Sequence, residues 1–151
     1  MGLGPGLHLR ASQSLVMSQQ LSQAIKLLQL SNLELASFVE RIAQHPFIAV
    51  DTEFMRENTY WPDLCLIQVA GAEEAAAIDP KAEIDLRPLL NLFVADEGVL
   101  KVFHAGGQDL EIIHNLTGKV PHPLFDTQIA AMALGHGEQI GYSNLIESLL
   151  G

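Results

Sequence analysis

The sequence predicts an α/β protein, and three observations support this fold class. Apolar stretches typical of buried strands alternate with amphipathic stretches typical of helices over residues 47–150. A chain of 151 residues has room for one domain with a substantial core. Its apolar fraction of 48% indicates a globular rather than a disordered chain.

The first expected strand, residues 47–54, carries the most informative pair of side chains. Five of its eight residues are apolar, yet Asp51 and Glu53 stand two positions apart within it. Side chains alternate across a strand, so both carboxylates lie on one face, roughly 7 Å apart along the chain. A buried anion is costly unless it is paired or bound to metal, and this strand contains no lysine or arginine. The pattern therefore predicts an acidic metal site at a strand end.

The same patterns predict the rest of the domain. We expect strands at 64–70, 75–79 and 99–103, and helices at 86–94, 107–116, 126–134 and 143–150. Asp126 suits the N-cap of the penultimate helix, and the run Pro121-His122-Pro123 interrupts the chain before it.

Two amphipathic helices are expected before the first strand. One should start after Ser18, with an apolar stripe at Leu21, Ala24, Ile25 and Leu28. Ser31 and Glu34 fit a capping box that opens a second helix, which runs to about residue 43. The stripes suit either packing against the following domain or binding of a partner.

Charge and cysteine content limit the classes of function. The net charge is −10, and residues 46–151 hold five basic against sixteen acidic groups, with no cluster of lysine or arginine. Phosphate binding through a general basic field is therefore excluded for this part of the chain. The single cysteine, Cys65, allows no internal disulfide, and the apolar runs are too short to span a membrane. We expect a cytoplasmic protein.

Three separated motifs carry a family resemblance. The stretches VDTEFMRENTYWPDLCLIQVA, VFHAGGQDLEIIHNL and FDTQIAAMALG occur in this order. Together they resemble the exonuclease domain of bacterial ribonuclease D, over residues 41–151. That family belongs to the DEDD 3′–5′ exonucleases. The resemblance implies a ribonuclease-H-like mixed sheet flanked by helices, and a metal-dependent exoribonuclease that trims RNA 3′ ends to nucleotide monophosphates.

The resemblance also implies the catalytic residues. Asp51, Glu53 and Asp109 match carboxylates that hold two Mg²⁺ or Mn²⁺ ions, with Asp51 as the bridging ligand. Carboxylate oxygen is the ligand type that these hard ions prefer. Taken alone, Asp109 is more typical of an acidic residue in the first turn of a helix, and it is the match to the family's second motif that favours a metal ligand.

Substrate contacts are expected around these carboxylates. His104, Gln108, Arg56 and Tyr60 are the candidates for binding the RNA, because Arg56 can reach a phosphate and an aromatic face can stack on a base. A structural role for His104, and packing of Tyr60 and Trp61 at the edge of the core, remain open alternatives. Asp126 also matches the family, although capping of its helix is the favoured role.

The family's third motif has no match in the sequence. It supplies a fourth carboxylate, four residues after a tyrosine or histidine that orients the attacking water. Here Tyr142 is followed at that distance by Ile146, and Glu147 stands one position late. We therefore expect a domain truncated at its C-terminus that is inactive by itself.

A second resemblance covers the beginning of the chain. Residues 1–40, with LHLRASQSLVMSQQLSQAIKLLQLSNLELASFVE, are similar to the activator-interaction region of the enhancer-dependent bacterial sigma factor. The sequence thus predicts a helical segment at 1–40 joined near residues 37–41 to the nuclease domain at 41–151. Two alternative functions follow. One is a transcription-interaction module that binds RNA polymerase or its activator ATPase, and the other is a pseudonuclease that binds RNA without cutting it.

Overall fold

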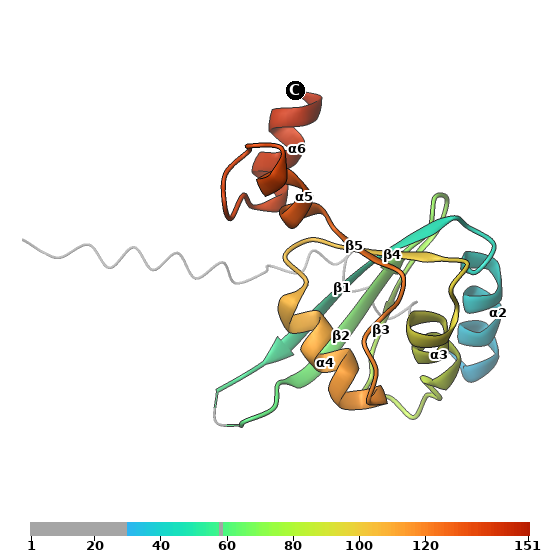
Figure 1. Ribbon diagram of the computed structural model, residues 1–151. Helices are drawn as coiled ribbons and strands as arrows, with labels where there is room; N and C mark the ends of the chain where they lie inside the picture. The colour runs from blue at the N-terminus through green and yellow to red at the C-terminus, as the bar shows by residue number, and fades with distance from the viewer. Residues whose placement is uncertain (1–29, 58) are drawn as a thin grey trace, which may run out of the picture.

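The computed structural model describes residues 30–57 and 59–151, and this part of the chain contains one five-stranded mixed sheet in the order β3-β2-β1-β4-β5 (Figure 1). β1 runs antiparallel to β2 and parallel to β4. The strands are β1 (Phe47–Met55), β2 (Asp63–Ala70), β3 (Ala75–Ile78), β4 (Leu100–Phe103) and β5 (Leu124–Asp126). The helices are α2 (Asn32–Ile42), α3 (Arg87–Ala95), α4 (Gly107–Thr117), α5 (Thr127–Ala133) and α6 (Tyr142–Leu150). The predicted α/β class, with helices flanking a mixed sheet, is confirmed.

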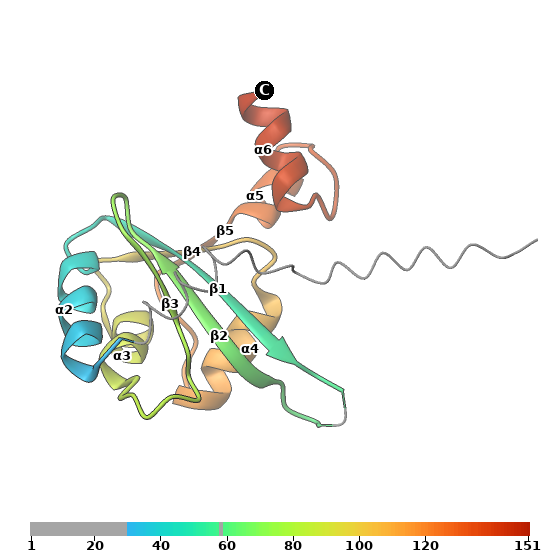
Figure 2. The same cartoon turned by 180° about the vertical axis from the view of Figure 1, so that it is seen from behind.

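The core lies between one face of the sheet and helices α2, α3 and α4 (Figures 1 and 2). Along β1 the buried side chains of Ile48, Val50 and Thr52 alternate with exposed ones, as the period of a strand requires. Leu35 of α2 and Leu89 of α3 are fully buried against this face. The alternation leaves Asp51 and Glu53 on the other side, away from the helices.

Helices α5 and α6 lie beyond β5, apart from the layer formed by α2 and α3 (Figure 1). Several of their apolar side chains remain exposed, including Leu134 at 76% and Leu150 at 77%. This arm, residues 127–151, is therefore joined to the sheet mainly through β5 and a few polar contacts near the end of β4.

Local signals in the sequence predict most element boundaries well. The capping box at Ser31 is confirmed: its hydroxyl accepts from the Glu34 N–H, while the Glu34 carboxylate accepts from the Ser31 N–H at 2.7 Å. Asp126 caps α5 as expected. The helix expected after Ser18 lies outside the described residues.

Two features of the fold depart from the pattern-based expectations. Strand β5 was not foreseen, because it has only three residues and its Leu124 and Phe125 side chains are exposed. It pairs with β4 in parallel, where Phe103 lies opposite Asp126.

Lys101 of β4 is completely buried, and its ammonium donates to the carbonyl oxygens of Asp96 and His122. Burial lowers the pKa of Lys101.

Among the described residues, no helix has the length and apolar character needed to cross a membrane.

Candidate active site

The candidate site lies where strand β1 separates from β4. β4 pairs with β1 only from Phe47 to Ala49, whereas β2 pairs with β1 as far as Met55. Beyond Ala49 the edge of β1 that faces β4 has no strand partner. Backbone groups left on such an edge must find another hydrogen-bond partner.

Asp109 provides that partner. It is the third residue of α4, and its side chain is buried, with 7% exposure. Its Oδ1 accepts from the Thr52 backbone N–H at 3.0 Å and also from the Thr52 hydroxyl. Asp109 therefore continues the edge of β1 in place of a strand. It is held next to Thr52, the residue between the two carboxylates of β1.

The electrostatics of Asp109 show that it lies in the field of Asp51. Burial raises the pKa of Asp109, the hydrogen bond from Thr52 opposes this rise, and the negative charge of Asp51 adds to it. Asp109 is buried whereas Asp51 is exposed, and their like charges repel, so a cation placed between them would be favoured.

The donor chemistry suits a divalent ion, although the geometry is only partly assembled. Asp51, Glu53 and Asp109 offer hard anionic oxygens of the type that Mg²⁺ and Mn²⁺ prefer. Within residues 30–57 and 59–151, however, no set of three acidic, histidine or cysteine side chains is arranged to hold a metal ion as it stands. The structure relates Asp51 to Asp109 through Thr52, while no contact ties Glu53 to either. The predicted three-ligand site stays a prediction.

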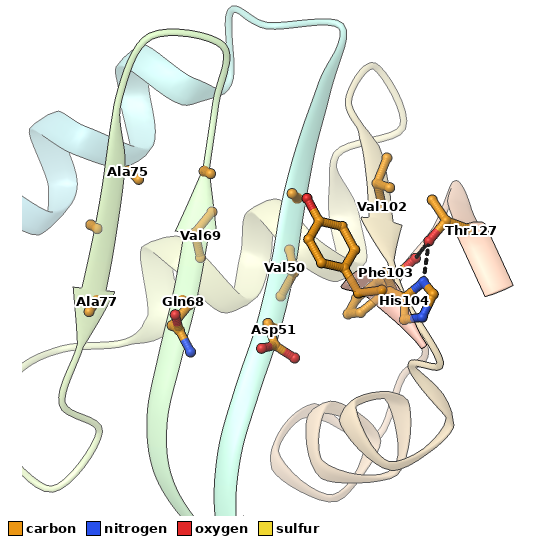
Figure 3. A pocket seen from close by; sticks show the side chains of 14 residues that line it. Val50, Asp51, Gln68, Val69, Ala75, Ala77, Val102, Phe103, His104 and Thr127 are labelled. Atoms are coloured by element: carbon orange, nitrogen blue, oxygen red, sulfur yellow. Dashed lines mark hydrogen bonds between the residues drawn. The ribbon is translucent and has the colours of Figure 1, made fainter. Parts of the chain in front are cut away.

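His104 belongs to a hollow on the open face of the sheet (Figure 3). The hollow has a volume of about 570 Å³, and Asp51, Gln68, His104 and Tyr142 line it among small apolar side chains. The His104 ring contacts the Thr127 hydroxyl through Nδ1 at 2.8 Å and the Ile140 carbonyl through Nε2 at 3.0 Å. Both ring nitrogens of His104 therefore connect β4 to the arm, and this contact supports the structural alternative for the residue. Gln108 is exposed at the start of α4 and does not line the hollow.

Arg56 and Tyr60 lie at the far end of β1. The Arg56 guanidinium forms an ion pair with Glu111 of α4 at 3.2 Å and donates to the Tyr60 carbonyl at 3.1 Å. Tyr60 stacks edge-to-face on Trp61, with ring centroids 5.0 Å apart. The alternative that these aromatic rings pack at the core edge is wrong for Tyr60, because 80% of this side chain is exposed. Among the described residues, no contact brings Arg56 or Tyr60 to Asp51.

Sequence reasoning missed Thr52 as a residue of the site. Its position between Asp51 and Glu53 directs its side chain to the buried face of the sheet, away from the two carboxylates. A hydroxyl at a buried strand position, flanked by two carboxylates, is the signal that could have pointed to it, since a buried hydroxyl needs a partner. That partner, Asp109, is 57 residues away in the chain.

Comparison with known proteins decides the family. A family model described as 3′–5′ exonuclease matches residues 30–151. The chain belongs to this family. Its members of the DEDD type depend on divalent metal ions. A second model, the activator interacting domain of the sigma-54 factor, matches residues 6–45. The two matches overlap at residues 30–45, and α2 packs into the core throughout its length, so the predicted boundary at 40/41 stays a prediction.

Individual relatives agree with this assignment. Ribonuclease D of Sphingobium indicum is 76% identical over 118 residues, which cover 78% of this chain and 30% of the relative. The crystal structure of Escherichia coli RNase D, an exoribonuclease involved in structured RNA processing, is 40% identical with a TM-score of 0.75. It covers 82% of this chain and 32% of that chain. NrnC of Brucella melitensis with bound Mg²⁺ is 26% identical with a TM-score of 0.62, covering 81% and 58%. The chain spans about 30% of the length of the curated relatives it matches.

Proposed function

We propose that residues 41–151 form part of the catalytic domain of a metal-dependent 3′–5′ exoribonuclease of the ribonuclease D type. The observation that carries the proposal is the placement of Asp109 against Thr52, which brings the second motif to the carboxylate strand of the first. The likeness to ribonuclease D at 76% identity supports it. The substrate is an RNA 3′ end, and the product is a nucleotide monophosphate.

Each residue of the site has a defined part in this proposal. Asp51, Glu53 and Asp109 would hold Mg²⁺ or Mn²⁺, and Asp51 would contact both ions. Such ions activate a water and stabilise the charge of the leaving oxygen. Thr52 orients Asp109 through two hydrogen bonds to one oxygen, which leaves Oδ2 of that carboxylate directed elsewhere. Arg56, Tyr60, His104 and Gln108 are the candidates for contacting RNA. The acidic surface supplies no general attraction for phosphate.

A cleavage assay tests the proposal. We expect residues 1–151 to bind Mn²⁺ weakly, and to release mononucleotides from a single-stranded RNA far more slowly than a polypeptide that also contains a third motif. The reason is that the groups of a two-metal site act together, so the loss of one ligand is not additive. The matched control is Asp51→Asn, which removes the bridging charge without changing the size of the side chain.

Two outcomes would contradict this prediction. Equal Mn²⁺ affinity in Asp51→Asn would remove Asp51 from the metal site. Rapid, Mn²⁺-dependent release of mononucleotides that the substitution abolishes would show that residues such as Tyr142 and Glu147 complete the site. The RNA should carry its label at the 5′ end as well as at the 3′ end in parallel reactions, so that the direction of degradation is read directly.

A separate role is supported for the first 45 residues. We infer that residues 6–45 derive from a segment that contacts RNA polymerase or an activator ATPase, because the sigma-54 match covers them. The apolar side chains of α2 that face the core are not free for such contacts. Pull-down of core polymerase with the full chain tests this role.

We also propose a cytoplasmic location, because the chain has a single cysteine and the proposed substrate is RNA.

A further inference from the structure

Asp126 lies between the arm and the turn that carries the second motif. It is the last residue of β5 and the N-cap of α5, and both of its carboxylate oxygens are used. Oδ1 accepts from the N–H groups of Gln128 at 2.8 Å and Ile129 at 3.4 Å, and these bonds cap α5. The other contacts of Asp126 are made to a different part of the chain.

These other contacts hold the turn between β4 and α4. Oδ1 also accepts from the Ala105 N–H at 3.1 Å, and Oδ2 accepts from the Gly106 N–H at 2.8 Å. Two successive backbone N–H groups that converge on one anion form a nest. A cap alone needs only one side-chain oxygen on the first N–H groups of its helix. The bond from Oδ2 to Gly106 therefore does nothing for α5.

The turn needs to be held, because its backbone is unusual. Ala105 has a φ of 56°, in the left-handed region that residues with a Cβ adopt at a cost. Gly106 packs so closely on the ring of Phe103 that a Cβ there would lie 2.6 Å from the Phe103 Cβ. Helix α4 begins at the next residue, and Asp109 is in its first turn. The position of this turn thus decides where the Asp109 carboxylate meets Thr52.

We propose that Asp126 is a positioning residue for Asp109, acting through the Ala105-Gly106 turn. A continuous path of hydrogen bonds and short backbone connects β5 to the turn, the turn to Asp109, and Asp109 to Thr52 on β1. The inference deepens the proposed function, because Asp109 is one of the candidate metal ligands. Its direct claim concerns the placement of Asp109, which is measurable without any activity.

The isosteric variant Asp126→Asn separates positioning from capping. Asparagine is as good an N-cap as aspartate, so its Oδ1 can keep the bonds to Gln128 and Ile129. Its amide nitrogen would face the Gly106 N–H, donor against donor, and that bond is lost. If Asp126 only caps α5, the variant should resemble the wild type. If Asp126 positions Asp109, the Thr52 amide should lose its partner more often.

Amide hydrogen exchange on the full chain, followed by NMR, gives the first measurement. In Asp126→Asn we expect the Thr52 amide to exchange about tenfold faster relative to the amides of β2, while the Gln128 amide stays within about twofold of wild type. Mn²⁺ affinity, measured by electron paramagnetic resonance, should fall about tenfold, the usual effect of losing a group that orients a metal ligand. Ser31→Ala, which removes the distant cap of α2, is the control. It should change neither the exchange rate of the Thr52 amide relative to the β2 amides nor the Mn²⁺ affinity.

Each result decides the matter. If the exchange rate of the Thr52 amide relative to the β2 amides (the Thr52 ratio) is unchanged in Asp126→Asn, the proposal is overturned and Asp126 is a helix cap only. If that variant also loses protection at Gln128, Asp126→Ser replaces it, because a serine hydroxyl caps α5 but cannot span to Gly106; the same Thr52 criterion then applies. Absence of Mn²⁺ binding in the wild-type chain would count against the proposed function, while the Thr52 ratio would still decide the role of Asp126.

Discussion

At the scale of single residues, the position of Asp109 lowers the stability of the protein when the carboxylate is charged, and a bound cation would offset this cost. The carboxylate is buried against β1, and the charge of Asp51 adds to the cost of its ionisation. Thr52 offsets part of this cost with two hydrogen bonds to one oxygen. A protein that used Asp109 only to finish the edge of β1 would do as well with a neutral side chain. Retention of a charge at this position is understandable where a metal ion is bound.

Asp109→Asn should therefore stabilise the chain when no metal is present. The pKa of Asp109 is raised in the folded state, so the folded state binds a proton more tightly than the unfolded state does. Stability consequently falls as the pH rises from the unfolded pKa to the raised folded pKa, and this loss is complete above the folded pKa. Asparagine keeps an oxygen for Thr52 and removes the charge. We expect a gain of order 1 kcal/mol at pH 7, the usual scale of a single substitution.

Thermal unfolding of both proteins, in EDTA, at pH 7 and at about pH 3, below the unfolded pKa, measures this effect. The difference in Tm should disappear at the lower pH. Adding Mn²⁺ should raise the Tm of the wild type more than that of the variant, because the variant has lost one of its three charged ligands. A lower Tm for Asp109→Asn at pH 7 in EDTA would show that the hydrogen bonds to the charged form outweigh its burial.

At the scale of elements, the adjacent glycines at the start of α4, Gly106 as its N-cap and Gly107 as its first residue, have different roles. Gly106 is enclosed by the Phe103 ring, whereas a Cβ on Gly107 would meet no atom within 4 Å. Gly106→Ala should destabilise the chain by about 1–3 kcal/mol, the range of overpacking substitutions. Gly107→Ala should be neutral or stabilising by up to about 1 kcal/mol, because alanine is favoured over glycine in a helix. Urea unfolding of the two variants gives the comparison, and equal effects would contradict this account of the turn.

The elements also show how far sequence reasoning reaches. As helix caps, Ser31, Glu34 and Asp126 contact backbone groups within three residues, so local sequence predicts these roles. The bonds from Ala105 and Gly106 to Asp126 span about 20 residues, and no local pattern predicts them. Asp51 and Glu53 were readable for the same reason, since strand periodicity is local. The bond between Thr52 and Asp109 joins residues 57 positions apart. The burial of Lys101 depends on the carbonyl of His122, which comes close only after β5 has paired with β4. Such features arise from tertiary structure, and no short pattern encodes them.

At the scale of the whole molecule, the two faces of the sheet differ in kind. Helices α2, α3 and α4 cover one face and form the core with it (Figure 2). The other face presents small side chains such as Ala49, Ala70 and Ala77 around the hollow near Asp51. Neither face gathers basic side chains, since residues 46–151 carry only five against sixteen acidic ones. If residues 46–151 bind RNA, as we propose, the affinity must then arise at the carboxylate site through a bound cation and through a few local contacts.

This charge distribution predicts an unusual response to salt. Proteins that bind single-stranded nucleic acid through Z basic groups lose affinity with a slope of about −0.7Z in log K against log salt. With Mn²⁺ held constant, we expect a slope between zero and about −1 for this chain, because few counterions are released. In EDTA the repulsion between RNA and the acidic surface acts alone, and salt screens it. Added NaCl should then increase the residual binding.

Fluorescence anisotropy of a labelled single-stranded RNA between about 50 and 200 mM NaCl, with and without Mn²⁺, measures both slopes. A steep loss of affinity, of 10³-fold or so over this range, would require a basic binding surface. The described residues contain no cluster that could form one, so that outcome would contradict the assignment of RNA binding to the carboxylate site.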